Sequence, residues 1–222
     1  MKPQASNIYS QFSKKHGSHS IANKRALELF EIFIRLDNSE NPILEIGAGI
    51  GTITRLLLSV TKQKIYAQEF NDECIIRLAK IKKNHQTRLY IDKEIVANSY
   101  KFIIIDGPYD KSQMLNAIKL SANSLSWIAI ENGRTATRIQ IANSLYKAGF
   151  RQSVVEFKRP NFKPSLTLFF VETPPYKLRV QSLFDFLVIM CRFWPKYIKL
   201  ILKYGRNHYK VGKKLENEFG KA

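Results

Sequence analysis

The sequence has little cysteine and no long hydrophobic run. Only two of its 222 residues are cysteines, Cys74 and Cys191, and two cysteines cannot form a disulfide framework. No stretch supplies the roughly 18 uninterrupted apolar residues of a simple membrane span, and the N-terminal segment has no apolar core of the signal-peptide kind. These absences predict a cytoplasmic protein in a reducing compartment.

Acidic residues are also scarce. Eighteen Asp and Glu stand against 36 Lys and Arg, so the formal net charge is +18. This excess indicates an anionic partner, which can be nucleic acid, an anionic membrane surface or a polyanionic substrate. The excess is uneven, because residues 174–222 hold 11 basic and only 3 acidic side chains. Pro174 and Pro175 mark the boundary before this tail, since consecutive prolines stop a preceding strand.

Between residues 42 and 172, short apolar runs alternate with helical patterns. Runs rich in Ile and aromatic residues predict strands at 42–46, 64–67, 88–91, 102–105, 127–130, 151–158 and 165–172. Helical patterns between them predict helices at 52–60, 72–83, 111–122 and 135–148. Alternating strands and helices predict an α/β fold with a parallel sheet and right-handed crossovers.

A glycine-rich loop follows the first predicted strand, in the run Pro42-Ile-Leu-Glu-Ile-Gly-Ala-Gly-Ile-Gly-Thr52. Glycine permits positive φ and lets a ligand approach the backbone closely, and the helix N-terminus beyond it favours an anionic group. Gly47, Gly49 and Gly51 follow the spacing G-x-G-x-G, with Glu45 two positions earlier. A dinucleotide fold would show G-x-G-x-x-G instead.

These motifs resemble the class I, Rossmann-like S-adenosylmethionine-dependent methyltransferases, over about residues 20–172. The resemblance implies a mostly parallel seven-stranded sheet with helices on both faces, and S-adenosylmethionine as cofactor. It implies that the family's E-x-G-x-G-x-G cofactor loop is formed by Glu45, Gly47, Gly49 and Gly51. Glu69, which follows the second predicted strand, stands where the family binds both ribose hydroxyls, a task that suits the two oxygens of a carboxylate.

The resemblance extends to two further strand ends. Asp92, after the third predicted strand, stands where the family often keeps a polar contact to the adenine amine. Asp106 follows the fourth predicted strand, where the family places residues that face the methyl group and the substrate. The resemblance is specific for the cofactor and says little about the acceptor.

Three polar residues follow the fourth and fifth predicted strands: Asp106, Glu131 and Asn132. A hydroxyl acceptor must lose its proton to a general base or to a cation that lowers its pKa. Catechol-type O-methyltransferases hold magnesium with Asp after strand four and Asp-Asn after strand five. Here Glu131 replaces the second Asp, and its longer stem would displace the ligand. We therefore expect Asp106 to act without a resident metal, and keep magnesium as the alternative.

Two substrate classes remain open. Asp106-Gly-Pro108 followed by Glu131-Asn-Gly-Arg134 is similar to a set of small-molecule and saccharide methyltransferases, in which Arg134 would clamp an anionic sugar or phosphate. The tetrapeptide that ends at Tyr109 also resembles that of adenine N-methyltransferases, whose aromatic residue stacks on a flipped base. The net charge of +18 suits this RNA alternative.

The N-terminal segment 1–19 contains His19, in a region that often covers the substrate pocket of this family. An imidazole titrates near neutrality, so His19 is a candidate general base. A surface histidine in an N-terminal turn is the alternative.

The tail is predicted to form a cationic amphipathic helix within residues 178–215. Six basic residues recur at helical spacing: Arg192, Lys196, Lys199, Lys203, Arg206 and Lys210. Apolar residues follow the same spacing on the opposite face, and Pro195 should kink or divide the helix. Such a helix suits an anionic membrane interface. Docking on the catalytic domain or on a twin subunit is the alternative.

Together these observations predict a methyltransferase domain at 20–173 and a basic tail at 174–222, peripheral to a membrane where the tail contacts one. The predicted reaction is methyl transfer to a hydroxyl of a small molecule or saccharide, and a lipid-linked acceptor would explain the tail. The candidate acceptor-side residues are Asp106, His19, Tyr109, Glu131, Asn132 and Arg134. The alternatives are N-methylation of RNA and a catalytically inactive module that binds the cofactor or a membrane.

Overall fold

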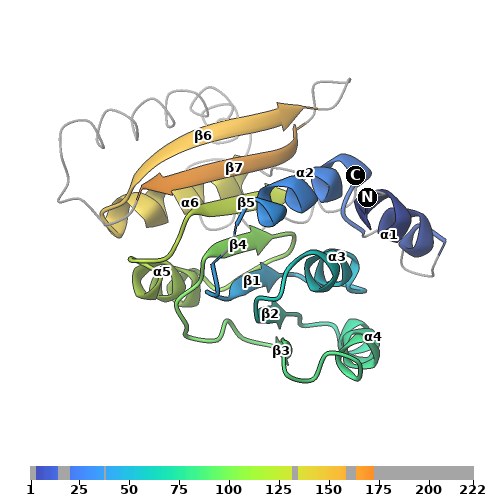
Figure 1. The fold of residues 1–222 in the computed structure, drawn as a ribbon. Helices are drawn as coiled ribbons and strands as arrows, with labels where there is room; N and C mark the ends of the chain where they lie inside the picture. Colours follow the sequence, from blue (N-terminus) through green and yellow to red (C-terminus); the bar gives the residue numbers. More distant parts are fainter. Residues whose placement is uncertain (1–3, 15–20, 38, 132–134, 159–163, 173–222) are drawn as a thin grey trace, which may run out of the picture.

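The structure, a computed structural model, describes residues 4–14, 21–37, 39–131, 135–158 and 164–172. One seven-stranded sheet forms its centre, with the strand order β3-β2-β1-β4-β5-β7-β6 (Figure 1). The strands are β1 (Ile43–Ile46), β2 (Ile65–Gln68), β3 (Leu89–Asp92), β4 (Phe102–Ile105), β5 (Trp127–Glu131), β6 (Arg151–Lys158) and β7 (Pro164–Glu172). Strands β1 to β5 run parallel, whereas β7 is antiparallel to both β5 and β6. The predicted mostly parallel seven-stranded sheet is confirmed.

Six helices lie in the described ranges: α1 (Gln4–Phe12), α2 (Lys24–Arg35), α3 (Thr52–Val60), α4 (Asp72–Lys82), α5 (Lys111–Leu120) and α6 (Thr135–Lys147). The last four begin at the predicted residues. Local capping explains part of this agreement, because the Asn71 side chain accepts from the Cys74 N–H at 3.1 Å. At the end of α6, Gly149 has a φ of +81°, which suits a helix stop.

Alternate residues of the central strands face two separate hydrophobic layers. In β4, Phe102 and Ile104 pack in the layer that contains α1, α2 and α3, whereas Ile103 and Ile105 pack in the layer that contains α5 and α6. Every residue of β4 is buried, as expected for a central strand covered on both faces. The confirmed fold therefore places helices on both faces of the sheet (Figure 1).

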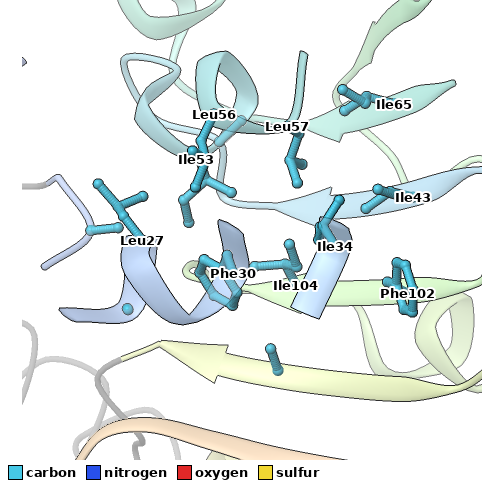
Figure 2. Close-up of a cluster of buried hydrophobic side chains, with 14 of the residues drawn as sticks. Leu27, Phe30, Ile34, Ile43, Ile53, Leu56, Leu57, Ile65, Phe102 and Ile104 are labelled. Atoms are coloured by element: carbon cyan, nitrogen blue, oxygen red, sulfur yellow. The ribbon is translucent and has the colours of Figure 1, made fainter. Parts of the chain in front are cut away.

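Helix α2 packs on the sheet through one apolar face. Figure 2 shows its side chains among those of α3 and the strands, and the α2 residues labelled there are Leu27, Phe30 and Ile34. All three are at most 1% exposed, and burial of each contributes about 1.5–3 kcal/mol to folding. The opposite face is exposed and holds ion pairs such as Lys24–Glu28 together with one exposed apolar residue, Ile32.

Helix α1, like α2, is not among the helices for which the sequence predicts a range. Its N-terminus is held by a residue of α2, since the Glu31 carboxylate accepts from the Ala5 N–H at 2.8 Å and from the Gln4 N–H at 3.2 Å. Although burial alone would raise it, these bonds hold the pKa of Glu31 below its ordinary value. Ile8 and Phe12 then bury the apolar face of α1. The first part of the segment 1–19 therefore packs on the domain.

The predicted tail at 174–222 lies outside the described residues, and so do its amphipathic helix and its predicted membrane contact. Within the described ranges, no helix is both long enough and apolar enough to span a bilayer.

Candidate active site

The carboxyl ends of five parallel strands bring most of the candidate residues to one edge of the sheet (Figure 1). The residues following β1 contact both neighbours, because the Gly47 N–H donates to the Gln68 carbonyl and the Asp106 N–H donates to the Ile46 carbonyl, each at 2.9 Å. On the far side of β2, the Glu69 N–H donates to the Asp92 carbonyl. The open α/β architecture predicts a ligand at such an edge.

The glycine loop adopts the conformation that its spacing predicts. Gly47, Gly49 and Gly51 have φ angles of +73°, +55° and +88°, all in the left-handed region that other residues seldom adopt. Gly51 is the N-cap of α3 and donates its own N–H to the Ala48 carbonyl at 2.9 Å. The chain therefore turns from β1 into α3 within a few residues.

Two of these glycines serve different purposes. A Cβ on Gly47 would lie 2.5 Å from both Cα and N of Gly107, so the loops that follow β1 and β4 touch backbone to backbone. A Cβ on Gly49 would meet nothing within 4 Å. Gly47 therefore serves packing inside the protein, whereas Gly49 leaves open space beside the loop.

Glu69 lies against this loop. One of its carboxylate oxygens accepts from the Gly49 N–H at 2.6 Å, and the other accepts from the N–H groups of Phe70 and Asn71 at 2.8 and 2.9 Å. Three backbone donors thus fix the orientation of a side chain that is 8% exposed. A carboxylate has about four acceptor positions, so Glu69 keeps capacity for a further donor.

Glu45 lies beneath the loop and is completely buried. Its two oxygens accept from the N–H and the hydroxyl of Thr54, at 3.2 and 2.7 Å, which ties β1 to the first turn of α3. Burial raises the pKa of Glu45 to about 8, and the nearby charge of Glu69 adds to the rise. Glu45 thus braces the glycine loop from the core side.

Asp92 is exposed, and its carboxylate accepts from the Glu94 N–H at 3.0 Å. It lies at the end of β3, and it lines a narrow crevice together with Tyr66, Gln68 and Tyr90. Tyr66 and Tyr90 stack there with a centroid distance of 4.8 Å. Asp92 therefore lies one strand beyond Glu69, on the side away from Asp106.

On the other side of the loop, Asp106 is half-buried after β4. The pairing of Ile105 with Ile130 puts Asp106 and Glu131 at neighbouring positions of adjacent strands. Tyr109 turns toward α6, where its hydroxyl donates to the Gln140 side chain at 3.2 Å. Tyr109 is also half-buried against the α5–α6 layer.

Glu131 is held by a residue that sequence reasoning did not connect to the site. Its carboxylate accepts from both the backbone N–H and the side-chain amide of Asn23, and Glu131 is 3% exposed. Asn23 is also the N-cap of α2, accepting from the Ala26 N–H at 3.0 Å. An Asn before an apolar helical run is a cap signal, but nothing local shows its bond to a residue 108 positions away.

Three predicted site residues, His19, Asn132 and Arg134, lie outside the described residues. Within the described ranges, no group of three or more His, Cys, Asp or Glu side chains is arranged to hold a metal ion. Of the predicted residues that are described, the structure brings Gly47, Gly49, Gly51, Glu69 and Asp106 to adjoining strand ends.

No protein-family model and no curated protein sequence matches the chain. Solved structures do match it. The SAH-bound Podospora anserina methyltransferase PaMTH1 aligns with a TM-score of 0.52 and 12% identity, over 78% of this chain and 89% of that one. The Geobacter metallireducens GS-15 precorrin-6y C5,15-methyltransferase aligns with a TM-score of 0.52 and 13% identity, over 74% and 94%. Thermoplasma acidophilum 1320 aligns with a TM-score of 0.52 and 14% identity, over 79% and 100%.

These likenesses establish the fold. The chain has the Rossmann-like fold of class I methyltransferases, as the resemblance of its glycine loop implied. Its own residues also suit the cofactor of that fold, because the space beside Gly49 and the fixed carboxylate of Glu69 lie next to each other.

Proposed function

We propose that the protein transfers a methyl group from S-adenosylmethionine to a hydroxyl of a small molecule or saccharide. One observation carries the cofactor part of the proposal: the Glu69 carboxylate lies 2.6 Å from the Gly49 nitrogen, at the place where the loop leaves open space. The remaining acceptor position of Glu69 suits one ribose hydroxyl, the second hydroxyl would replace one of the three backbone donors, and the glycine loop offers a backbone that a ligand can approach.

Each cofactor residue has a distinct task in this proposal. Glu69 binds the ribose hydroxyls, Gly49 gives the cofactor access to the backbone, and Asp92 contacts the adenine amine from the neighbouring strand end. Gly47 and Gly51 shape the turn, and Glu45 holds the turn on α3 through Thr54. The bound sulfonium supplies an already activated methyl group, so the protein mainly aligns the acceptor and excludes water.

Asp106 is the proposed acceptor-side base. It is half-buried at the strand end next to the glycine loop, joined to β1 by its own N–H, and a carboxylate there can take the proton of an acceptor hydroxyl. Asn132 and Arg134 are proposed to contact the acceptor, and His19 to cover it. Glu131 acts on this pocket by fixing Asn23 and thus the start of α2.

Methylation of RNA amines is the second candidate, on the strength of the Asp106-Gly107-Pro108-Tyr109 sequence. In that reaction the aromatic ring must be free to stack on a flipped base. The half-buried position of Tyr109 and its bond to Gln140 on α6 favour a packing role for the ring instead. The hydroxyl acceptor is therefore preferred.

Calorimetric titration of the purified protein with S-adenosylmethionine and S-adenosylhomocysteine tests the cofactor part. We expect saturable binding of both at one site, and absence of binding to either would refute it. Saccharides and lipid-linked glycans are then screened as acceptors. With an acceptor found, Asp106→Asn should keep cofactor affinity while turnover falls about 100-fold or more, and undiminished turnover would remove Asp106 as the base.

The basic tail is proposed to hold the enzyme at an anionic membrane surface, on the strength of its basic stripe and opposite apolar face. Sedimentation of the full chain with anionic vesicles should be strong and should weaken with salt. Equal, salt-insensitive sedimentation with neutral vesicles would contradict the electrostatic part of this proposal.

A further inference from the structure

A second concave site lies beside the glycine loop, between the end of α1 and the outer sides of α3 and α4. It has a volume of about 390 Å³ and is lined by Phe12, Ile50, Arg55, Arg77, Lys80, Ile81 and Asn84. We call this set the basic pocket. It shares no lining residue with the strand-end site, because neither Glu69, Asp92 nor Asp106 lines it. Its volume falls within the lower part of the range for small-ligand pockets.

The charge of the basic pocket has one sign. Arg77 and Lys80 lie one turn apart on α4, Asn84 follows the end of that helix, and Arg55 reaches the same space from α3. Among the described residues, the lining includes three cations and no acid. Among the ion pairs within the described ranges, none involves Arg55 or Lys80.

Most charged groups near the basic pocket add to its positive charge. Partial burial, followed by the charges of Arg55 and Arg88, lowers the pKa of His85, which follows α4. The nearest acid along α4 is Glu73, one turn before Arg77, and it is exposed. Positive charge therefore dominates this side of the domain.

The apolar part of the lining is closely packed. Phe12 is only 3% exposed, and Ile81 packs so closely on Gly51 that a Cβ there would lie 2.6 Å from its Cδ1 atom. Arg55 and Arg77 are half-buried and line the same space.

We propose that the basic pocket binds the diphosphate group of a small ligand. Guanidinium groups pair bidentately with phosphate oxygens, Lys80 adds a point charge, and Asn84 adds amide donors. The apolar floor accommodates the group to which the diphosphate is attached. A bounded pocket favours such a ligand over a polynucleotide, which requires an extended groove along its backbone. The inference goes beyond the proposed function, since it does not depend on methyl transfer.

Calorimetric titration of the full chain with inorganic pyrophosphate at low ionic strength tests the proposal. The test variant is the double substitution Arg55→Gln and Lys80→Gln. The control is Lys62→Gln and Lys64→Gln, which removes the same charge from two exposed lysines between α3 and β2. We expect saturable binding that weakens about ten-fold or more in the test variant and less than about two-fold in the control.

Two results would overturn the proposal: no saturable binding by the unsubstituted chain, or equal weakening in both variants, which would indicate general charge attraction. A short single-stranded RNA is titrated in parallel. If RNA binds more tightly than pyrophosphate and loses that affinity in the test variant, the basic pocket is an RNA-backbone site and the small-ligand proposal is wrong. S-adenosylmethionine affinity, measured on the same samples, should not change, so failure of the proposed function is scored separately.

Discussion

The two halves of the strand-end site differ in how they are built. The cofactor half comprises the ends of β1, β2 and β3, and its carboxylates are fixed mainly by near neighbours in the sequence: Glu69 by Phe70 and Asn71, with Gly49, 20 residues before it, as the third donor, and Glu45 by Thr54. The acceptor half comprises the ends of β4 and β5, and its Glu131 is fixed by Asn23, 108 residues away. Local geometry builds one half and chain topology builds the other.

This difference explains which chemistry the sequence reveals. A loop that must hold the same cofactor in many proteins needs the same glycine spacing, because the backbone itself forms the contact. An acceptor pocket is assembled from separate segments whose side chains vary with the substrate. The sequence motifs therefore predict the residues of the cofactor half. The residues of the acceptor half can be identified only from the fold, which brings separate segments together.

The largest loss of stability is expected where the loop after β1, in the cofactor half, touches the loop after β4, in the acceptor half. Gly47→Ala places a methyl group 2.5 Å from the backbone of Gly107 at a φ of +73°. The left-handed conformation costs about 1–2 kcal/mol, and overpacking against a backbone that cannot move aside adds about 1–3 kcal/mol. Urea unfolding should show a loss of about 3 kcal/mol in the free energy of unfolding.

Gly49→Ala is the matched control, because it has the same chemistry at a φ of +55° but meets no atom within 4 Å. It should lose only about 1–2 kcal/mol of stability, yet it should weaken cofactor binding because the methyl group enters the open space. Equal destabilisation by the two substitutions would mean that Gly47 and Gly107 do not pack as described.

The next largest effect is expected on cofactor affinity, and it tests the cofactor half alone. Glu69→Ala should weaken S-adenosylmethionine binding about 10- to 100-fold, since hydrogen bonds to a charged group are worth about 1.5–3 kcal/mol. The circular dichroism spectrum should be unchanged, because Glu69 lies at a strand end and belongs to neither hydrophobic cluster. Glu94→Ala, an exposed carboxylate near Asp92, is the control and should bind normally. Unchanged affinity of Glu69→Ala would show that the ribose contact is misplaced.

The sequence predicts the parts of this molecule that depend on nearby residues, such as apolar runs and helix caps. The strands were predicted from apolar runs, and α4 begins after Asn71 because that side chain caps it. The sequence does not predict helix α1, because the group that caps it is Glu31, from another helix. Its burial also depends on α2 and α3. The bond between Asn23 and Glu131 is not predicted for the same reason, because sequence order does not show which distant residues become neighbours.

A smaller effect tests the acceptor half. Asn23→Ala removes the α2 cap and one of the donors to the buried Glu131. A lost cap costs about 1 kcal/mol, and the lost bond to a buried carboxylate adds about 1 kcal/mol or more. We therefore expect thermal or urea unfolding to show a loss of about 2 kcal/mol or more.

Asn71→Ala removes the corresponding cap of α4, where the side chain is exposed and bonds only within its own turn. It should lose about 1 kcal/mol. The difference between the two variants measures the bond from the Asn23 side chain to Glu131. If both lose the same amount of stability, that side-chain bond contributes nothing.

The strongest pH dependence of stability is expected at Glu45. Its pKa rises from 4.5 to about 8 on folding, so between these values the folded state binds more protons than the unfolded state. Stability must therefore fall as the pH rises through this window, and it is fully retained only below 4.5. In Glu45→Gln, a neutral amide accepts from the Thr54 N–H and donates to the Thr54 hydroxyl, as the protonated acid does. The variant should match the unsubstituted protein below pH 4.5 and exceed it in free energy of unfolding above pH 8. Parallel stability curves across this range would mean that Glu45 stays ionised in the folded state.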